Sequence, residues 1–188
     1  MNATRLFVLG ELARGPMHGH QIRREAQLDR TELWADVKPG SLYAALHRLV
    51  AEGAIEVVRT EQSGGPARTV YALTQLGRQE LAAQRDEALQ QTGLHPDPVD
   101  LALQYTGDLA EEELRRLITD RRAALAAELA AWEHQRERAE PYLRGLEPMT
   151  FVHTALRLRA EIDWHDQLLD QLPKLLAAEA PEGGHGNG

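Results

Sequence analysis

The apolar residues in the first half of the chain follow a helical period three times and then alternate. Residues 4–14 are expected to form a helix that ends at Gly15-Pro16. A second helix is expected from Met17 to Leu28, followed by a loop over Asp29–Asp36. These two short helices precede the most informative segment of the sequence.

A third helix is expected to begin at Pro39 and to end at Gly53. One face of this helix is apolar and contains Leu42, Leu46, Leu49 and Val50. The other faces carry no acidic residue and contain Ser41, Tyr43, Ala44, His47 and Arg48. Such a helix fits the major groove of DNA, although an ordinary surface helix would show the same pattern.

After Gly53 the pattern changes to that of two short strands, 54–60 and 68–73, joined by a polar loop with Gly-Gly-Pro. Thr74 then caps a helix over about 75–91. The order of three helices, a hairpin and a helix is typical of a winged helix-turn-helix domain. In that fold the third helix enters the major groove and the wing, here 61–67, touches the backbone.

The candidate DNA-binding residues fall into three groups. Tyr43, Ala44, His47 and Arg48 face away from the apolar side of the third helix. Lys38, Gly40 and Ser41 lie at its N-terminal end, where backbone N–H groups favour a phosphate, and Ser63 and Arg68 lie at the wing. For each residue the alternative is a solvated surface position, and for Lys38 the two interpretations are evenly balanced.

The Pro-rich segment 93–98 separates a second half that is helical throughout. We expect a DNA-binding domain over 1–92, a helical domain over 93–180 and a disordered tail over 181–188. Helices are expected over about 99–105, 110–143 and 150–180, with Pro173 kinking or shortening the last. Its seam residues are spaced by 4, 3, 4, 3 and 4, namely Leu158, Ile162, His165, Leu169, Leu172 and Leu176.

Two long helices with broad apolar faces and no third long partner predict a homodimer packed about a two-fold axis. We expect the six seam residues of the last helix to lie in this dimer interface. A dimer would also read two DNA half-sites about one helical turn apart. Trp132, His153, Arg157 and Trp164 are candidates for an effector pocket, because aromatic rings and a cation suit a planar or acidic small molecule. The alternative, which we weight more heavily, is that the tryptophans fill the dimer core.

Charge is distributed unevenly between the halves. The chain has 188 residues and a net charge of −8, with 11 Lys/Arg against 11 Asp/Glu in residues 1–90 and 10 against 18 in residues 91–188. The acidic excess therefore lies in the second half, and contact with DNA must be local. The chain has no cysteine and no apolar run long enough for a membrane span, so we expect a cytoplasmic protein.

The sequence contains no recognisable catalytic or phosphate-binding motif, and its histidines lack ligand spacing. We therefore expect neither an enzyme nor a metal or other cofactor. Two other classes stay open as alternatives: a protein-interaction module that uses the same winged-helix surface, and, ranked third, a helical protein that binds or converts small molecules.

Several motifs taken together resemble the PadR family of bacterial transcription regulators. They are His18-Gly-His-Gln-Ile22, Pro39-Gly-Ser-Leu-Tyr-Ala-Ala-Leu-His-Arg-Leu49, Glu52-Gly53 and Tyr71-Ala-Leu-Thr-Gln-Leu-Gly77. The resemblance implies a repressor that binds double-stranded DNA, dimerises through C-terminal helices and responds to a small-molecule effector. The chain departs from the family pattern at His20, where Tyr is common, which affects either packing between the second and third helices or a phosphate contact.

Overall fold

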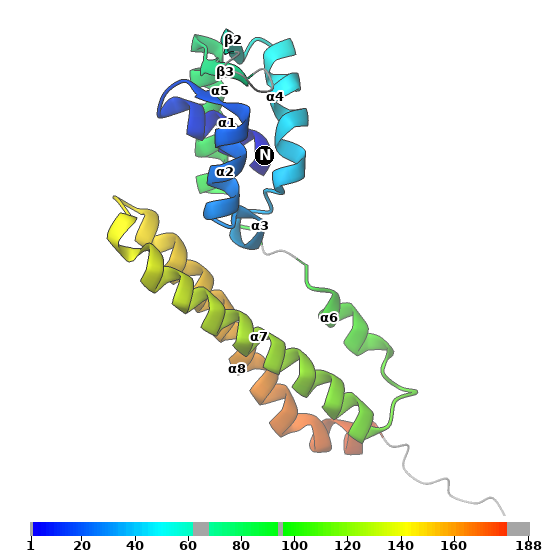
Figure 1. Ribbon diagram of the computed structural model, residues 1–188. Helices are drawn as coiled ribbons and strands as arrows, with labels where there is room; N and C mark the ends of the chain where they lie inside the picture. Colours follow the sequence, from blue (N-terminus) through cyan, green and yellow to red (C-terminus); the bar gives the residue numbers. More distant parts are fainter. Residues whose placement is uncertain (1, 62–67, 94–95, 180–188) are drawn as a thin grey trace, which may run out of the picture. The chain divides into compact units, whose positions relative to one another are not determined.

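The computed structural model describes residues 2–61, 68–93 and 96–179. The chain divides into two compact units, Met1–Leu94 and His95–Gly188 (Figure 1). Most of the described residues are helical, and the strands form one small antiparallel sheet. The expected fold class, mainly α with a small β-hairpin, is confirmed. The tail over 181–188 lies outside the described residues.

The N-terminal unit places its helices around one apolar core. They are α1 (Ala3–Ala13), α2 (Gly19–Leu28), α3 (Thr31–Trp34), α4 (Leu42–Ala51), which follows the 3-10 turn η1 (Pro39–Ser41), and α5 (Gln75–Gln90). The short helix α3 occupies part of the segment expected to be a loop. Gly53 ends α4 with φ +74°, a conformation that glycine adopts without steric cost.

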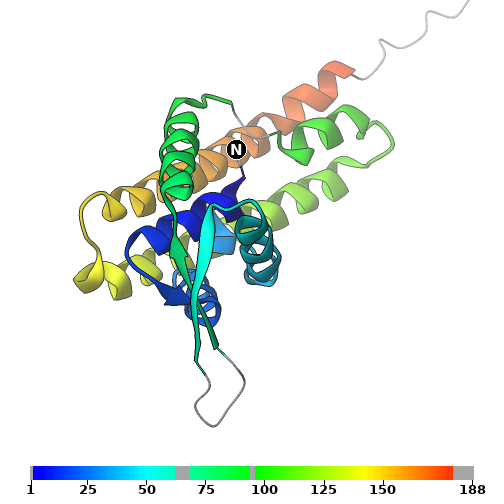
Figure 2. The same cartoon turned by 90° about the horizontal axis from the view of Figure 1, so that it is seen from above.

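The sheet has three strands in the order β1-β3-β2: β1 (Met17–His18), β2 (Ile55–Glu61) and β3 (Arg68–Leu73). Strands β2 and β3 form the expected antiparallel hairpin, which Figure 2 shows projecting beyond the helices of its unit. The helix expected from Met17 begins instead at Gly19, because Met17 and His18 pair with Tyr71 and Val70. Two residues are too few for their periodicity to reveal a strand.

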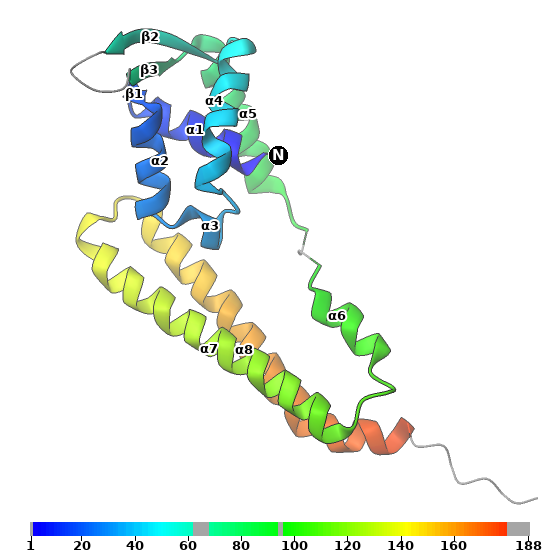
Figure 3. The ribbon, with the colours of Figure 1, turned by 45° about the vertical axis from the view of Figure 1, so that its right-hand side comes forward.

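The C-terminal unit is built on a helical hairpin. Its elements are α6 (Pro98–Ala102), η2 (Leu103–Tyr105), α7 (Glu111–Ala139), η3 (Glu140–Tyr142) and α8 (Glu147–Glu179). Helices α7 and α8 run side by side in opposite directions (Figure 3). An apolar cluster of Leu114, Ile118 and Leu172 joins them, and Arg122 donates two hydrogen bonds to Asp166 at 2.8 and 2.9 Å.

Pro173 lies inside α8 and does not end it, because the helix continues to Glu179. Figure 3 shows α8 changing direction in its C-terminal part, in agreement with the expected kink. Among the described residues, no helix combines the length and the apolar character that crossing a membrane requires.

Candidate nucleic-acid interface

Helix α4 has one face in the core and one face in solvent. Leu42, Leu46 and Leu49 are completely buried. Tyr43, Ala44, His47 and Arg48 are exposed on the opposite side, as the sequence predicted. Burial of three leucines stabilises the helix by about 1.5–3 kcal/mol for each side chain, so the core fixes which residues face outward.

The segment before α4 is held by hydrogen bonds within the chain. The buried Thr31 hydroxyl donates to the Val37 carbonyl oxygen at 3.0 Å, which anchors the residue next to Lys38. The Ser41 hydroxyl donates to the Lys38 carbonyl oxygen at 2.8 Å. Its hydrogen is therefore used in closing the turn, whereas Lys38 and Gly40 are exposed. At this end of α4, Lys38 and Gly40 are thus the exposed candidates, and Ser41 is partly buried.

The N-terminal end of α2 packs against the buried Leu46 of α4 and against the ring of Tyr43. A Cβ atom added at Gly19 would lie 3.0 Å from Leu46 and 3.3 Å from the ring of Tyr43. Gly19 therefore lets α2 approach the Tyr43 ring closely, while 41% of this tyrosine remains exposed. His20, the departure from the PadR pattern, is exposed, so its side chain is not packed in the core between α2 and α4.

Of the two DNA-binding candidates at the wing, Arg68 lies within the described residues. Arg68 begins β3 and is exposed, and its partner in the strand register is Glu61. Ser63 lies outside the described residues. A register shift between Val57 and Arg59 marks a bulge in β2, which increases the local twist of the hairpin. The described parts of the hairpin thus bring one arginine toward the wing tip.

An ion-pair cluster around Arg5 was not predicted from the sequence. The Arg5 guanidinium donates two hydrogen bonds to the carboxylate of Glu80 on α5 and also pairs with Glu52 at the end of α4. These hydrogen bonds lower the pKa of Glu80 below its ordinary value, although burial acts in the opposite direction. Neither periodicity nor spacing signals the cluster, because its three residues come from three different elements.

The proposed dimerisation seam is largely turned toward α7 of the same chain. His165 is completely buried, and Leu172 is 3% exposed. The Nε2 atom of His165 accepts a hydrogen bond from Arg121 Nε at 3.1 Å, and Nδ1 lies 2.7 Å from the Glu161 carbonyl oxygen. Leu158, Ile162, Leu169 and Leu176 are partly buried. Within the chain, the most buried residues of the seam therefore serve to pack α8 against α7.

The four effector candidates do not form one site within the chain. Trp132 is buried, stacks on Phe151 with ring centroids 4.7 Å apart, and donates to the Phe151 carbonyl oxygen. Trp164 lies 13 residues after Phe151 in α8, roughly 20 Å away from it along the helix axis. His153 and Arg157 are exposed and share one flank of α8 with Trp164. Trp132 is thus part of the hairpin core, and the other three residues share a surface.

Comparison with known proteins places these features in a family. Residues 8–83 match the model of the transcriptional regulator PadR-like family. The transcriptional regulator Rv3488 of Mycobacterium tuberculosis is 36% identical over 83 residues, which are 44% of this chain and 73% of that protein.

Solved structures show the same fold over almost the whole chain. Bacillus subtilis PadR in complex with operator DNA has a TM-score of 0.72 at 22% identity, covering 92% of this chain and 98% of that one. The PadR-like regulator BC1756 from Bacillus cereus has a TM-score of 0.68 at 18% identity, covering 92% and 99%. The family model matches residues 8–83, and the chain covers 73% of Rv3488 at 36% identity. The chain therefore belongs to the PadR-like family of transcriptional regulators.

Proposed function

We propose that the chain is a homodimeric repressor that binds a pseudo-palindromic operator in double-stranded DNA. The observation that carries this proposal is the division of α4 into a fully buried face and a face of exposed Tyr, His and Arg side chains. In the major groove, such side chains can bond to base edges and phosphates. Bacillus subtilis PadR, which shares the fold, was solved in complex with operator DNA.

The proposed binding mode assigns a role to each group of residues. Tyr43 and His47 read base edges in the major groove, and Arg48 contacts a phosphate beside it. Lys38 and the backbone at Gly40 meet a phosphate at the start of α4, and Arg68 meets one at the wing. The dimer would present two copies of α4 to half-sites about one helical turn apart. Since the named relatives are regulators, we propose a cytoplasmic protein without enzymatic activity.

The proposed regulation is release by a small-molecule effector. Bacillus subtilis PadR has also been solved in complex with p-coumaric acid, with a TM-score of 0.70 at 19% identity. In this chain, His153, Arg157 and Trp164 offer a cation and aromatic rings on one flank of α8. Those groups suit a planar acid.

Selection of bound duplexes from a random DNA pool tests the proposal. The expected result is enrichment of an inverted repeat whose half-sites lie about 10 base pairs apart. The measured affinity for the enriched duplex should exceed that for random DNA by about 10³-fold or more at physiological salt. Binding without any enriched sequence, or no binding, would contradict the proposal and favour the alternative of a protein-interaction module.

A further inference from the structure

Arg5 is a cation whose charge is already used by two carboxylates. Its guanidinium forms hydrogen bonds with both carboxylate oxygens of Glu80, one of them at 2.7 Å, and its Nη2 atom also pairs with Glu52. Only 22% of the Arg5 side chain is exposed. With two acidic partners and little exposure, Arg5 is poorly suited to contact DNA itself.

Arg48 has the opposite character. It lies on the exposed face of α4, and its hydrogen bond runs from Nε to the Ala44 carbonyl oxygen of the same helix at 3.3 Å. Within the part of the chain that the structure describes, Arg48 forms no ion pair. Its charge is therefore available to a phosphate.

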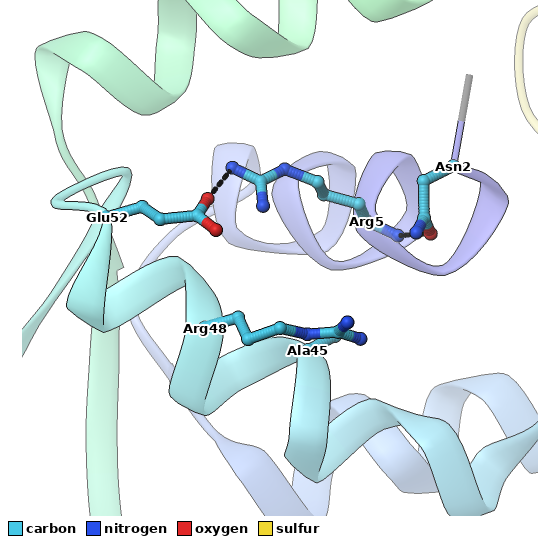
Figure 4. A pocket seen from close by; sticks show the side chains of 5 residues that line it. All are labelled: Asn2, Arg5, Ala45, Arg48 and Glu52. Atoms are coloured by element: carbon cyan, nitrogen blue, oxygen red, sulfur yellow. Dashed lines mark hydrogen bonds and ion pairs between the residues drawn. The ribbon is translucent and has the colours of Figure 1, made fainter.

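Glu52 lies between these two arginines. Arg5, Arg48 and Glu52 line one small open pocket, together with Asn2 and Ala45. Figure 4 shows the carboxylate of Glu52 turned toward Arg5, and the guanidinium of Arg48 pointing away from Glu52. The carboxylate thus has two cations within its surroundings and is bound to only one of them.

The spacing of Arg48 and Glu52 would permit the other pairing. They are four residues apart at the end of α4, a separation that places side chains on one helix face. The same order and spacing already forms an ion pair in α7, where Arg116 Nη1 lies 3.3 Å from Asp120 Oδ2. Glu52 would therefore be a competitor for the charge of Arg48 if Arg5 did not bind it.

We propose that Arg5 is a positioning residue that holds Glu52 away from Arg48 and so keeps the Arg48 guanidinium free for a DNA phosphate. This inference rests on the proposed DNA-binding function. It assigns to α1, which carries none of the candidate contacts, a direct influence on the charge that α4 presents.

Operator affinity in three proteins tests the inference: the wild-type chain, Arg5→Met and the double variant Arg5→Met/Glu52→Gln. The probe is the duplex enriched from random DNA. Arg5→Met should weaken binding about three- to tenfold and reduce the salt slope by about one, the amount expected for one lost phosphate contact. The double variant should recover to within about twofold of the wild type, because the competing carboxylate is gone.

A merely structural role for Arg5 predicts no such recovery. If the double variant binds as weakly as Arg5→Met, or if Arg5→Met binds as tightly as the wild type, the inference is wrong. A second test measures the effect of Arg5→Met on operator affinity in the Arg48→Met protein. There, Arg5→Met should have no further effect. An equal loss in both backgrounds would also overturn the inference.

The variant Glu80→Gln, which changes the other partner of Arg5, is the control for an effect on folding. Glu80→Gln should lower the melting temperature and leave operator affinity unchanged, because the pair between Arg5 and Glu52 remains. If Arg5→Met does not fold, the same comparison is made with Glu80→Gln present in every protein, which removes the carboxylate left unpaired. A wild-type chain that enriches no sequence would overturn the proposed function together with this inference, whereas equal operator affinities overturn the inference alone.

Discussion

Gly77 lies where the first turn of α5 approaches the start of β2, and no larger residue fits there. A Cβ atom at this position would lie 2.0 Å from the Ala54 carbonyl oxygen, a backbone atom that cannot move aside cheaply. The same carbonyl accepts hydrogen bonds from the Thr74 amide and hydroxyl, at 3.2 and 2.9 Å. The Thr-Gln-Leu-Gly motif is thus a junction between the wing and α5.

We predict that Gly77→Ala lowers the free energy of unfolding by about 3 kcal/mol, because the added methyl group must displace backbone. Gly10→Ala is the matched control. Apart from the neighbouring backbone of its own helix, no atom lies within 4 Å of its added Cβ. Alanine is favoured over glycine in a helix interior by about 0.5–1 kcal/mol. Urea denaturation should therefore show opposite signs for the two variants, and equal signs would contradict the packing assignment.

His47 is the residue of α4 whose removal should separate specific from non-specific binding. We predict that His47→Ala weakens operator binding about tenfold or more while random-DNA binding changes little, because base contacts carry the sequence information. Tyr43→Ala should behave similarly.

Arg68→Ala should weaken both kinds of binding and reduce the salt slope by about one. Unchanged operator affinity in all three variants would contradict the placement of α4 in the groove.

At the scale of single residues, the sequence predicts which face of a helix is buried. It does not predict which side chains bond to one another. The buried Leu42, Leu46 and Leu49 follow from helical spacing alone. The bond between Arg5 and Glu80 joins residues 75 positions apart, and no local pattern can report it. His165 shows the same limit. Its place in an apolar seam is readable from the sequence, whereas its bond to Arg121 depends on how α7 lies against α8.

The contact of α1 with α5 includes the ion pair between Arg5 and Glu80, whose strength varies with pH. Hydrogen bonds from Arg5 lower the pKa of Glu80, so the ionised carboxylate is stabilised more in the folded than in the unfolded chain. This contribution is fully present above the unfolded pKa of about 4.3 and is lost as the pH falls through the lower folded pKa.

We predict that Glu80→Gln costs about 1–2 kcal/mol of stability at neutral pH, because a charge-assisted hydrogen bond to a partly buried group is lost. Thermal unfolding of both proteins between pH 7 and pH 2 measures the effect. The difference should shrink below about pH 4, where the wild-type carboxyl takes up its proton. A difference that stays constant down to pH 2 would show that the side-chain charge is not its source.

Elements were predictable where their pattern repeats. The long helices α7 and α8 carry several turns of regular spacing, and the hairpin strands carry alternation on both sides of a glycine-rich loop. The short elements β1 and α3 carry neither. Strand β1 forms because Met17 and His18 pair with the edge of β3 that β2 does not occupy. This pairing is a tertiary contact, which the local sequence pattern does not report.

At the scale of the whole molecule, the C-terminal unit buries little apolar surface by itself. Its buried apolar residues, among those that the structure describes, are Leu114, Ile118, Trp132, Ala155 and Leu172. Large apolar side chains stay exposed on the same unit: Leu101, Tyr105, Leu117, Tyr142, Leu146, Met149, Leu156 and Leu175. A unit with so small a core and so much exposed apolar surface favours association with a second copy.

Leu175 offers a direct test of that association. It is 49% exposed and lies on the flank of α8 that also carries Trp164, Leu168 and Arg157. We predict that Leu175→Glu shifts the chain from dimer to monomer in sedimentation experiments, because a charge would have to be buried in an apolar interface. Operator affinity should fall together with dimerisation, since a monomer reads one half-site only.

Ala177→Glu is the matched control, because Ala177 is exposed on the same turn of α8 but points about 160° away from Leu175. It adds the same charge at almost the same distance from the helix end, so any general effect of charge or helix fraying is shared. The control variant should remain dimeric and keep its operator affinity. If both variants dissociate, the helix end as a whole is responsible; if neither does, the dimer uses a different surface. A monomeric Leu175→Glu protein that still binds the full operator as tightly as the wild type would separate dimerisation from DNA reading.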